Sequence, residues 1–266
     1  MNNSVKIQLE GLEFNLYLHE DETLSNRLRE FGYHNYNNIA LLKRFLRPGQ
    51  HFLDLGANIG WYTVIASLLT GEDGRVYAFE PDNNNYALLE KNCRINNCTN
   101  IVLENYAVSD ITGQERLYKN PENFGDHSLG KNTHLRCFNY HNESCQDVRS
   151  LRLDQYFNDE NFAAISLIKM DTQGCEPKII RGLEKLLARH RPTIIMEYAP
   201  GHIYEVGNSA FEIFAFIENY KYQPYHIIEH EALPCEVRPL TVLELFEKTF
   251  EFKNTYGGMD LLLTPQ

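Results

Sequence analysis

Residues 51–70 have the sequence HFLDLGANIGWYTVIASLLT. The apolar run 51–55 predicts a short buried strand, and residues 61–70 predict a helix. The turn between them contains Gly56 and Gly60, and glycines let a backbone turn tightly or approach a ligand closely. A strand, a glycine turn and a helix in this order predict the start of a doubly wound α/β domain.

The alternation of strands and helices continues to the end of the chain. Further strands are predicted at 75–80, 100–105, 165–171, 192–197, 222–227 and 259–264, and helices at 82–96, 177–190 and 210–220. Strands that alternate with helices pair in parallel. No crossover helix is expected before the last strand, so we expect that strand to be antiparallel. The prediction is a Rossmann-like α/β fold with a seven-stranded, mostly parallel sheet and helices on both faces.

Two regions fall outside this alternation. Residues 5–18 predict a β-hairpin around Glu10-Gly11, and residues 36–46 predict a helical lead-in. Residues 1–48 would then be a small N-terminal addition to a main domain at 49–266. Residues 119–147 are polar and lack periodicity, which is typical of a lid or substrate loop.

Composition narrows the class of protein. The formal net charge is −11 and the sequence pI is about 5.4, so the surface repels polyanions and we expect no nucleic acid partner. No apolar stretch is long enough to cross a bilayer, and the N-terminus does not resemble a signal peptide. The six cysteines lack metal-site spacing. We therefore expect a cytoplasmic protein with reduced thiols and no metal.

The glycine turn also predicts the kind of cofactor. A dinucleotide site needs GxGxxG, but Asn58 replaces the middle glycine here and would crowd a pyrophosphate. S-adenosylmethionine (SAM) has no pyrophosphate, so the spacing of Gly56 and Gly60 suits it. Asp54 could order the turn and face the amino group of SAM. Glu80 ends the next strand, where an acidic side chain accepts hydrogen bonds from ribose hydroxyls.

Four blocks of the sequence resemble the FkbM-type methyltransferases. They are DLGANIGWYT (54–63), AFEPD (78–82), NYAVSD (105–110) and KMDTQGCEPKIIRG (169–182), in the order and spacing of that family. The resemblance implies the class I methyltransferase fold and SAM as the cofactor. It places the cofactor site at Asp54, Gly56, Asn58, Gly60 and Glu80, with Asn105 and Ala107 beside the adenine.

The fourth block departs from the commonest family pattern. Many members have DVEGxE, whereas this chain has Asp171-Thr172-Gln173-Gly174-Cys175-Glu176, a form that also occurs in the family. The exchange removes one carboxylate, so Gln173 cannot serve as a base or a metal ligand.

Candidates for catalysis lie at the ends of the fourth and fifth strands and in the polar loop. Methyl transfer to a hydroxyl requires alignment and removal of a proton. Asp171 ends the fourth strand and Glu197 the fifth, where ligands of open α/β sheets bind. His127, beside Asp126, has an ordinary pKa near 6.5 that suits a base. We expect Asp171 and His127 to be catalytic. The Asp-Asn pair of metal-dependent O-methyltransferases is absent after the fifth strand.

The leading hypothesis is a SAM-dependent O-methyltransferase that acts on a hydroxyl of a glycan or secondary metabolite. A nucleic-acid amino methyltransferase would need (Asp/Asn)-Pro-Pro-(Tyr/Phe) after the fourth strand, where this chain has Asp171-Thr-Gln-Gly. A NAD-dependent oxidoreductase is disfavoured by Asn58. A non-catalytic SAM-binding protein would leave Asp171 and the 119–147 loop without a role.

Overall fold

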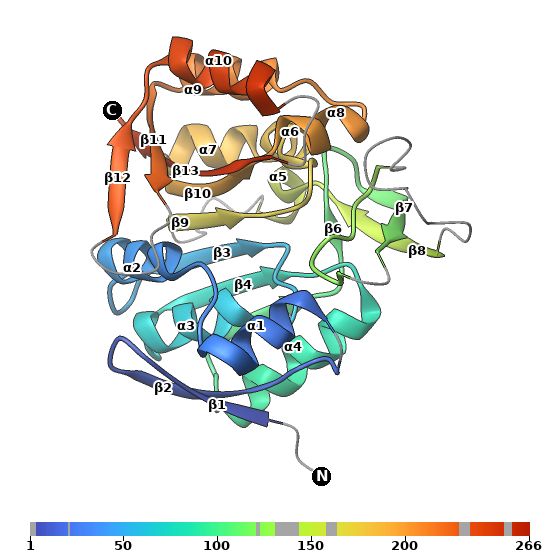
Figure 1. The fold of residues 1–266 in the computed structure, drawn as a ribbon, viewed down its shortest axis with the longest axis vertical. Coiled ribbons are helices and arrows are strands. Elements are labelled where there is room, and N and C mark those ends of the chain that lie inside the picture. Colours follow the sequence, from blue (N-terminus) through green and yellow to red (C-terminus); the bar gives the residue numbers. More distant parts are fainter. Residues whose placement is uncertain are drawn as a thin grey trace.

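The computed structural model describes residues 4–20, 22–120, 123–130, 144–157, 164–228, 235–252 and 257–266. One sheet of eight strands forms its centre, in the order β12-β11-β13-β10-β9-β3-β4-β5 (Figure 1). These strands are β3 (His51–Leu55), β4 (Arg75–Phe79), β5 (Ile101–Glu104), β9 (Ile165–Met170), β10 (Thr193–Tyr198), β11 (Tyr222–Ile228), β12 (Glu236–Pro239) and β13 (Met259–Pro265).

The direction of winding reverses in the middle of this sheet. β3 pairs in parallel with β4 on one side and with β9 on the other. From β3 the chain proceeds through β4 to β5, whereas from β9 it proceeds through β10 in the opposite direction. A reversal of this kind opens a crevice beyond the carboxyl ends of the two central strands, and ligands of open α/β sheets bind there.

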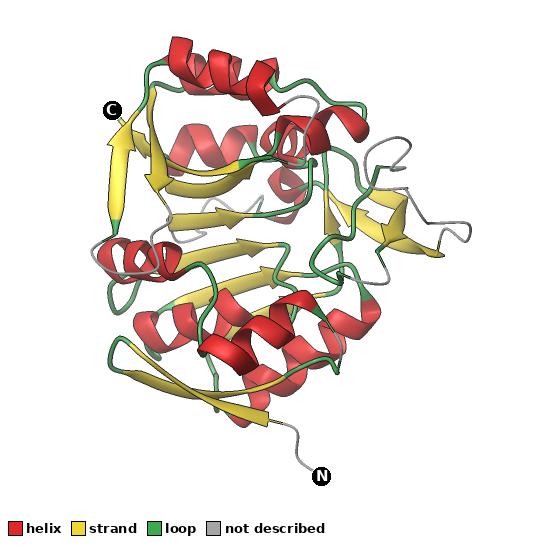
Figure 2. Cartoon of the chain, viewed as in Figure 1, coloured by secondary structure: helices red, strands yellow, loops and turns green. Residues whose placement is uncertain are grey.

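Helices cover both faces of the sheet, as the colouring by secondary structure shows (Figure 2). They are α3 (Trp61–Thr70), α4 (Asn83–Ile95), α5 (Leu153–Tyr156), α6 (Glu176–Gly182), α7 (Glu184–His190), α8 (Pro200–Glu205), α9 (Phe211–Asn219) and α10 (Val242–Phe252). Two large clusters of buried apolar side chains result. One contains Val64 and Leu89 of α3 and α4, and the other contains Ile179 and Ile213 of α6 and α9. The expected α/β fold with helices on both faces is confirmed.

The N-terminal residues pack onto the first of these clusters. They form β1 (Ser4–Leu9), β2 (Leu12–Tyr17), α1 (Thr23–Phe31) and α2 (Tyr36–Phe45). The hairpin and α2 were expected, whereas α1 was not. Phe14 is buried, and its ring centroid lies 5.7 Å from that of Trp61 in α3. The hairpin thus shares its apolar core with the main sheet.

A second, smaller sheet lies beside the carboxyl ends of β3, β4 and β9, toward which the arrowheads point in Figure 1. It consists of β6 (Ala107–Val108), β7 (Gly113–Lys119) and β8 (Ser144–Leu151), in the order β6-β8-β7. Both ends of the 119–147 stretch therefore lie in strands. Residues 121–122 and 131–143 of that stretch are outside the described residues.

Three details of the main sheet differ from the expectation. The sheet has eight strands because residues 236–239 pair with β11 at the edge. The last strand, β13, is antiparallel to β10 as predicted. The prediction assumed that no helix precedes this strand, and that assumption was wrong, because α10 lies directly before it. The single helix expected at 177–190 is divided at Leu183. The backbone N–H groups of Lys185 and Leu186 donate to the Asp154 carboxylate, which caps the second helix, α7.

Candidate functional site

A cavity of 630 Å³ lies at the switch point of the sheet, within the size range of small-molecule sites. The turn after β3, the ends of β4, β9 and β10, the strand β6, the segment 123–129 and the N-terminal helix α1 contribute to its lining. Among the predicted site residues, Gly56, Asn58, Glu80, Ala107, His127 and Asp171 line this cavity. Residues distant in the sequence thus meet in one place.

A close contact within the fold excludes a side chain at each of the two glycines of the turn. Gly56 has φ +84°, and a Cβ built on it would lie 2.1 Å from the carbonyl oxygen of Asp171. Gly60 has φ +93°, and its Cβ would lie 2.7 Å from Cδ1 of Leu89 in α4. A side chain at Gly56 would therefore push β3 away from β9 before it met any ligand.

Asn58 shapes the turn through its backbone. It has φ 50°, a left-handed conformation that asparagine tolerates better than most residues. This conformation directs its N–H to Oε2 of Glu80, at 2.8 Å. The first two cofactor blocks of the sequence are thus joined directly.

Glu80 is nearly fully buried at the wall of the cavity. Oε1 accepts a second backbone hydrogen bond, from Asp82 at 2.8 Å. Each carboxylate oxygen can accept one more hydrogen bond. Burial raises the pKa of Glu80 to about 8, although the two backbone donors oppose this rise.

Three predicted cofactor residues, Asp54, Gly60 and Asn105, lie outside the cavity lining. Asp54 is buried and accepts a hydrogen bond of 2.5 Å from the Thr63 hydroxyl on Oδ2. Its Oδ1 has no hydrogen-bond partner among the described residues, and burial raises its pKa to about 6. Asn105 donates from Nδ2 to the carbonyl oxygens of Glu80 and Pro81. Asp54 therefore supports the first turn from within, and Asn105 supports the second.

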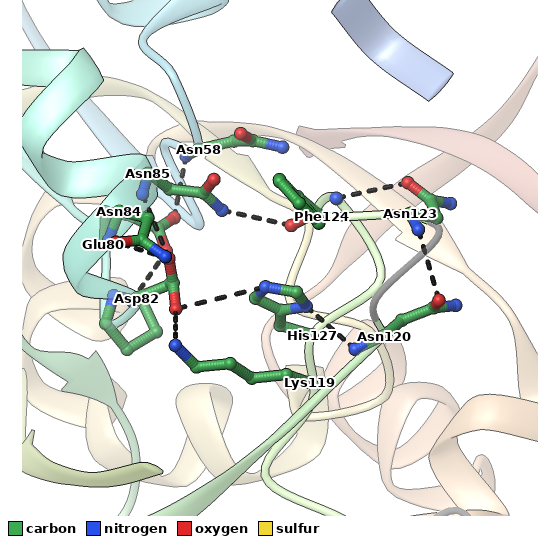
Figure 3. A network of polar contacts seen from close by, with 12 residues as sticks. Asn58, Glu80, Asp82, Asn84, Asn85, Lys119, Asn120, Asn123, Phe124 and His127 are labelled. Carbon is green, nitrogen blue, oxygen red and sulfur yellow. Dashed lines mark hydrogen bonds and ion pairs between the residues drawn. The ribbon is translucent and has the colours of Figure 1, made fainter. Parts of the chain in front are cut away.

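Asp82, the first residue of the helix predicted at 82–96, joins the polar segment to the cofactor end of the cavity. It caps α4 through Oδ1, which accepts the N–H groups of Asn84 and Asn85. Its Oδ2 forms an ion pair of 2.5 Å with Lys119 Nζ. Figure 3 shows Asp82 between Lys119 and His127. Asn85 also donates to the carbonyl oxygen of Phe124, so the segment is tied to the first turn of α4.

His127 lies in this network rather than beside Asp171. Its Nδ1 accepts the N–H of Asn120 at 3.1 Å, and its Nε2 lies 4.0 Å from Oδ2 of Asp82. The single proton of the neutral ring is therefore on Nε2. Burial lowers the pKa of His127 from its ordinary value near 6.5 to about 4, although the Asp82 carboxylate opposes this shift. Neither ring nitrogen presents a free lone pair to the cavity in this arrangement.

Asp171 is the centre of a second polar cluster at the ends of β9 and β10. Its Oδ2 pairs with Nζ of the fully buried Lys169 at 3.1 Å. Its Oδ1 accepts a hydrogen bond of 3.0 Å from Nε2 of Gln173. The same Nε2 donates to Oε2 of Glu197 at 3.0 Å. Gln173 has φ 55°, so the backbone is held in an uncommon conformation to bring its amide between the two acids.

The two acids of this cluster have opposite pKa shifts. Burial raises the pKa of Asp171, but the Lys169 ammonium and the Gln173 amide outweigh it and lower the pKa below its ordinary value. Burial and the repulsion from Asp171 and Glu176 raise the pKa of Glu197 well above its ordinary value. The pair therefore consists of an acid that readily ionises, Asp171, and an acid that holds its proton to higher pH, Glu197.

The sequence analysis missed the contribution of the N-terminal residues. Arg27 of α1 and His34, between α1 and α2, both line the cavity. The carbonyl oxygen of His34 accepts a hydrogen bond of 3.1 Å from Nε1 of Trp61, which holds this loop at the start of α3. Arg27 belongs to the densest run of basic residues in the chain. Such a run is as typical of a solvated helix face as of a binding site, so the sequence did not identify Arg27 as a site residue.

Within the described ranges, no three His, Cys, Asp or Glu side chains are grouped so that they could hold a metal ion. None of the helices in those ranges has the length and apolarity needed to span a bilayer.

Part of the chain is similar in sequence to a curated protein. This relative is described as a probable cobalt-precorrin-6B C(15)-methyltransferase (decarboxylating) from Sulfurisphaera tokodaii. It is 38% identical over 65 residues, which are 24% of this chain and 34% of that protein. The matched part is therefore about a third of the relative's length.

Similar solved structures include two methyltransferases. Methyltransferase FkbM from Methylobacillus flagellatus KT has 17% identity and a TM-score of 0.47, over 92% of this chain and 56% of that one. Precorrin-6y C5,15-methyltransferase from Geobacter metallireducens GS-15 has 11% identity and a TM-score of 0.47, over 87% and 88%. At TM-scores below 0.5, these likenesses add nothing to what the sequence and the fold establish.

The family model for the methyltransferase FkbM domain matches residues 54–224, which is more than half of the chain. This range begins at Asp54 of the glycine turn and includes Glu80, Asp171 and Glu197, so both polar clusters of the cavity lie inside it. The chain belongs to the FkbM methyltransferase family.

Proposed function

We propose that this protein is a SAM-dependent O-methyltransferase that acts on a hydroxyl of a glycan or secondary metabolite. The observation that carries this proposal is the cavity at the switch point, which has a buried acid, Glu80, at one end and an ionised acid, Asp171, at the other. The first suits a cofactor that carries a ribose, and the second suits removal of a proton from an acceptor.

The residues at the Glu80 end fit SAM. The Glu80 carboxylate is placed to accept a hydrogen bond from a ribose hydroxyl, and the same cavity is lined by the apolar residues Phe79, Val108, Leu117 and Leu129, which suit contact with an adenine. Oδ1 of Asp54, which has no hydrogen-bond partner among the described residues, lies buried at the base of the same turn. When bound, SAM supplies a methyl group that the positive sulfonium makes electrophilic.

The residues at the Asp171 end handle the proton. The Asp171 carboxylate accepts the hydroxyl proton while the acceptor oxygen forms its bond to the methyl carbon and the sulfur–methyl bond breaks. Lys169 keeps Asp171 ionised, and Gln173 fixes its orientation. The low pKa of Asp171 makes it a weak base, so alignment by the cavity must contribute a large part of the rate. His127 is the second candidate base of the sequence analysis, and its role is tested below.

Titration calorimetry tests the cofactor. We expect SAM and its product S-adenosylhomocysteine (SAH) to bind and NAD not to bind. Glu80→Ala should weaken SAH binding by about 1.5–3 kcal/mol, the cost of hydrogen bonds to a charged acceptor. Glu90→Ala, at an exposed position of α4, is the matched control and should bind SAH like the parental protein. Equal SAH affinity in the Glu80 and Glu90 variants would place the cofactor elsewhere.

A further inference from the structure

Arg27 is a cation of the cavity whose guanidinium has no ion-pair partner among the described residues. Its side chain is exposed and lines the cavity from α1, so it lies at the opening. It makes no ion pair, hydrogen bond or ring contact with any residue that the structure describes. In a chain with a net charge of −11, a guanidinium that faces a cavity without a carboxylate partner is free to bind an anion.

His34 continues the polar lining from Arg27 toward Asp171. Its Nδ1 is buried and has no hydrogen-bond partner among the described residues. Burial lowers the pKa of His34 to about 4; the Asp171 carboxylate opposes this shift and the Arg27 cation adds to it. The ring is therefore neutral at physiological pH, and Nδ1 can accept a hydrogen bond from a ligand hydroxyl or donate one, depending on the tautomer.

The inner end of the same lining is acidic. Asp171 and Glu197 face the cavity there, and Glu176 is buried behind them with Oε1 bonded to the Thr172 backbone and hydroxyl. A ligand anion would be repelled from this end, and a ligand hydroxyl would be accepted by it. The two ends therefore define one orientation for a ligand that carries both groups.

We propose that the N-terminal segment 23–35 forms the acceptor-binding site and that the acceptor is a hydroxylated anion, bound through its carboxylate or phosphate by Arg27. The hydroxyl of the bound acceptor then lies beside His34 and Asp171, while its anionic group stays at Arg27. This proposal rests on the proposed function, because it assigns the part of the cavity that the cofactor leaves open. Guanidinium is suited to the task, since its fork of N–H donors matches both carboxylate and phosphate oxygens.

Three sugars of similar size provide the test: glucose, glucuronate and glucose 6-phosphate. Their dissociation constants are measured by saturation-transfer NMR in the presence of saturating SAH. We expect at least one of the two anionic sugars to bind at least tenfold more tightly than glucose, and the stronger of the two identifies carboxylate or phosphate as the preferred group. Added salt should weaken that binding but not the binding of glucose.

Variants then assign the binding to Arg27. Arg27→Gln should remove the preference for the anionic sugar, so that its dissociation constant approaches that of glucose. Arg44→Gln removes the same charge from an exposed position of α2 outside the cavity lining, and it should retain the preference. The proposal is overturned if neither anionic sugar binds better than glucose, or if Arg27→Gln keeps the preference. SAH binding, measured separately, must be the same in all three proteins; its absence from the parental protein would contradict the proposed function instead.

Discussion

Asp171 and Glu197 lie side by side in environments that shift their pKa values in opposite directions. Asp171 contacts an ammonium and an amide, so it stays ionised. Burial and the repulsion from Asp171 raise the pKa of Glu197 well above its ordinary value, and the Lys169 ammonium opposes this rise only in part. A pair of acids whose pKa values are shifted in opposite directions is a frequent feature of catalytic sites.

Replacement of Asp171 tests its role as a base. Asp171→Asn keeps the shape of the side chain but removes the proton acceptor, so turnover should fall roughly 10²–10⁴-fold. SAH affinity should change little, because the Asp171 side chain is bonded to Lys169 and Gln173 and not to Glu80. The measurement is methyl transfer to an identified acceptor, with calorimetry of SAH on the same samples.

His127→Ala separates the two candidate bases. If His127 only holds the polar segment against Asp82, this variant should weaken SAH binding and leave the pH profile of turnover unchanged. A profile whose acidic limb disappears in His127→Ala would assign the base to His127 instead. Parental turnover in both variants would mean that alignment alone drives the reaction.

Glu80 predicts a dependence of cofactor binding on pH. Its pKa is raised to about 8 in the free protein, and hydrogen bonds from ribose hydroxyls favour the ionised form. Below about pH 8 the free carboxyl is protonated, so SAH binding must release a proton and the affinity should rise with pH. The rise, from about pH 6 to about pH 8.5, can be followed by calorimetry in buffers of different ionisation enthalpy. Glu80→Gln should bind more weakly and lack this dependence, and a flat profile in the parental protein would contradict the assignment.

At the scale of elements, the main feature is the attachment of the segment after β7 to the N-terminus of α4. Lys119 and Asp82 form this attachment together with the hydrogen bond from Asn85 to Phe124. Because Asp82 also caps α4 and lies next to Glu80, the position of the segment is coupled to the shape of the cofactor end. We expect residues 119–147 to act as a lid or substrate loop, a prediction that the described part of the chain leaves untested.

Lys119→Met tests this coupling. The change leaves the Asp82 carboxylate buried with one partner fewer, which should cost about 1–3 kcal/mol of stability and also weaken SAH binding. A second change, Asp82→Asn, removes the unpaired charge while asparagine can still cap α4. The double variant should therefore recover part of the stability in thermal unfolding.

Lys91→Met, at an exposed position of α4, is the control for the loss of a lysine, and its melting temperature should match that of the parental protein. An unchanged SAH affinity in Lys119→Met would show that the segment does not shape the cofactor end.

At the scale of the whole molecule, the N-terminal hairpin and the main sheet share one apolar cluster. Ile7, Phe14 and Leu16 are buried against α3 and α4, and the side chain of Asn92 in α4 bonds the backbone of Tyr17. Phe14→Ala should therefore destabilise the entire protein by about 3–5 kcal/mol, as expected for a large buried side chain. Chemical denaturation should still show one cooperative transition.

Phe31→Ala is the matched control, because Phe31 is 54% exposed and its loss should change stability by less than about 0.5 kcal/mol. Two separate transitions in Phe14→Ala, with SAH binding kept through the first, would instead make the hairpin an independent unit.

Local pattern by itself determined the main elements. The apolar run 51–55, the glycine turn and the helix 61–70 occur at the predicted residues, because their signals are short-range: burial of a continuous apolar run and a backbone that only a few residue types adopt. The four blocks predicted the family for the same reason, since each block is a turn or strand end with its own local requirements.

Only the tertiary structure decided how these elements make a site. The carbonyl oxygen of Asp171 leaves no room for a side chain at Gly56. Asp82 forms an ion pair with Lys119. Arg27 lines the cavity from α1, a helix that the sequence pattern did not predict. None of these contacts has a sequence signature, because each depends on which strand lies next to which and on where a remote helix is packed. The same is true of the pKa values: burial and neighbouring charges, which sequence spacing does not specify, lower the pKa of Asp171 and of His127 and raise that of Glu197.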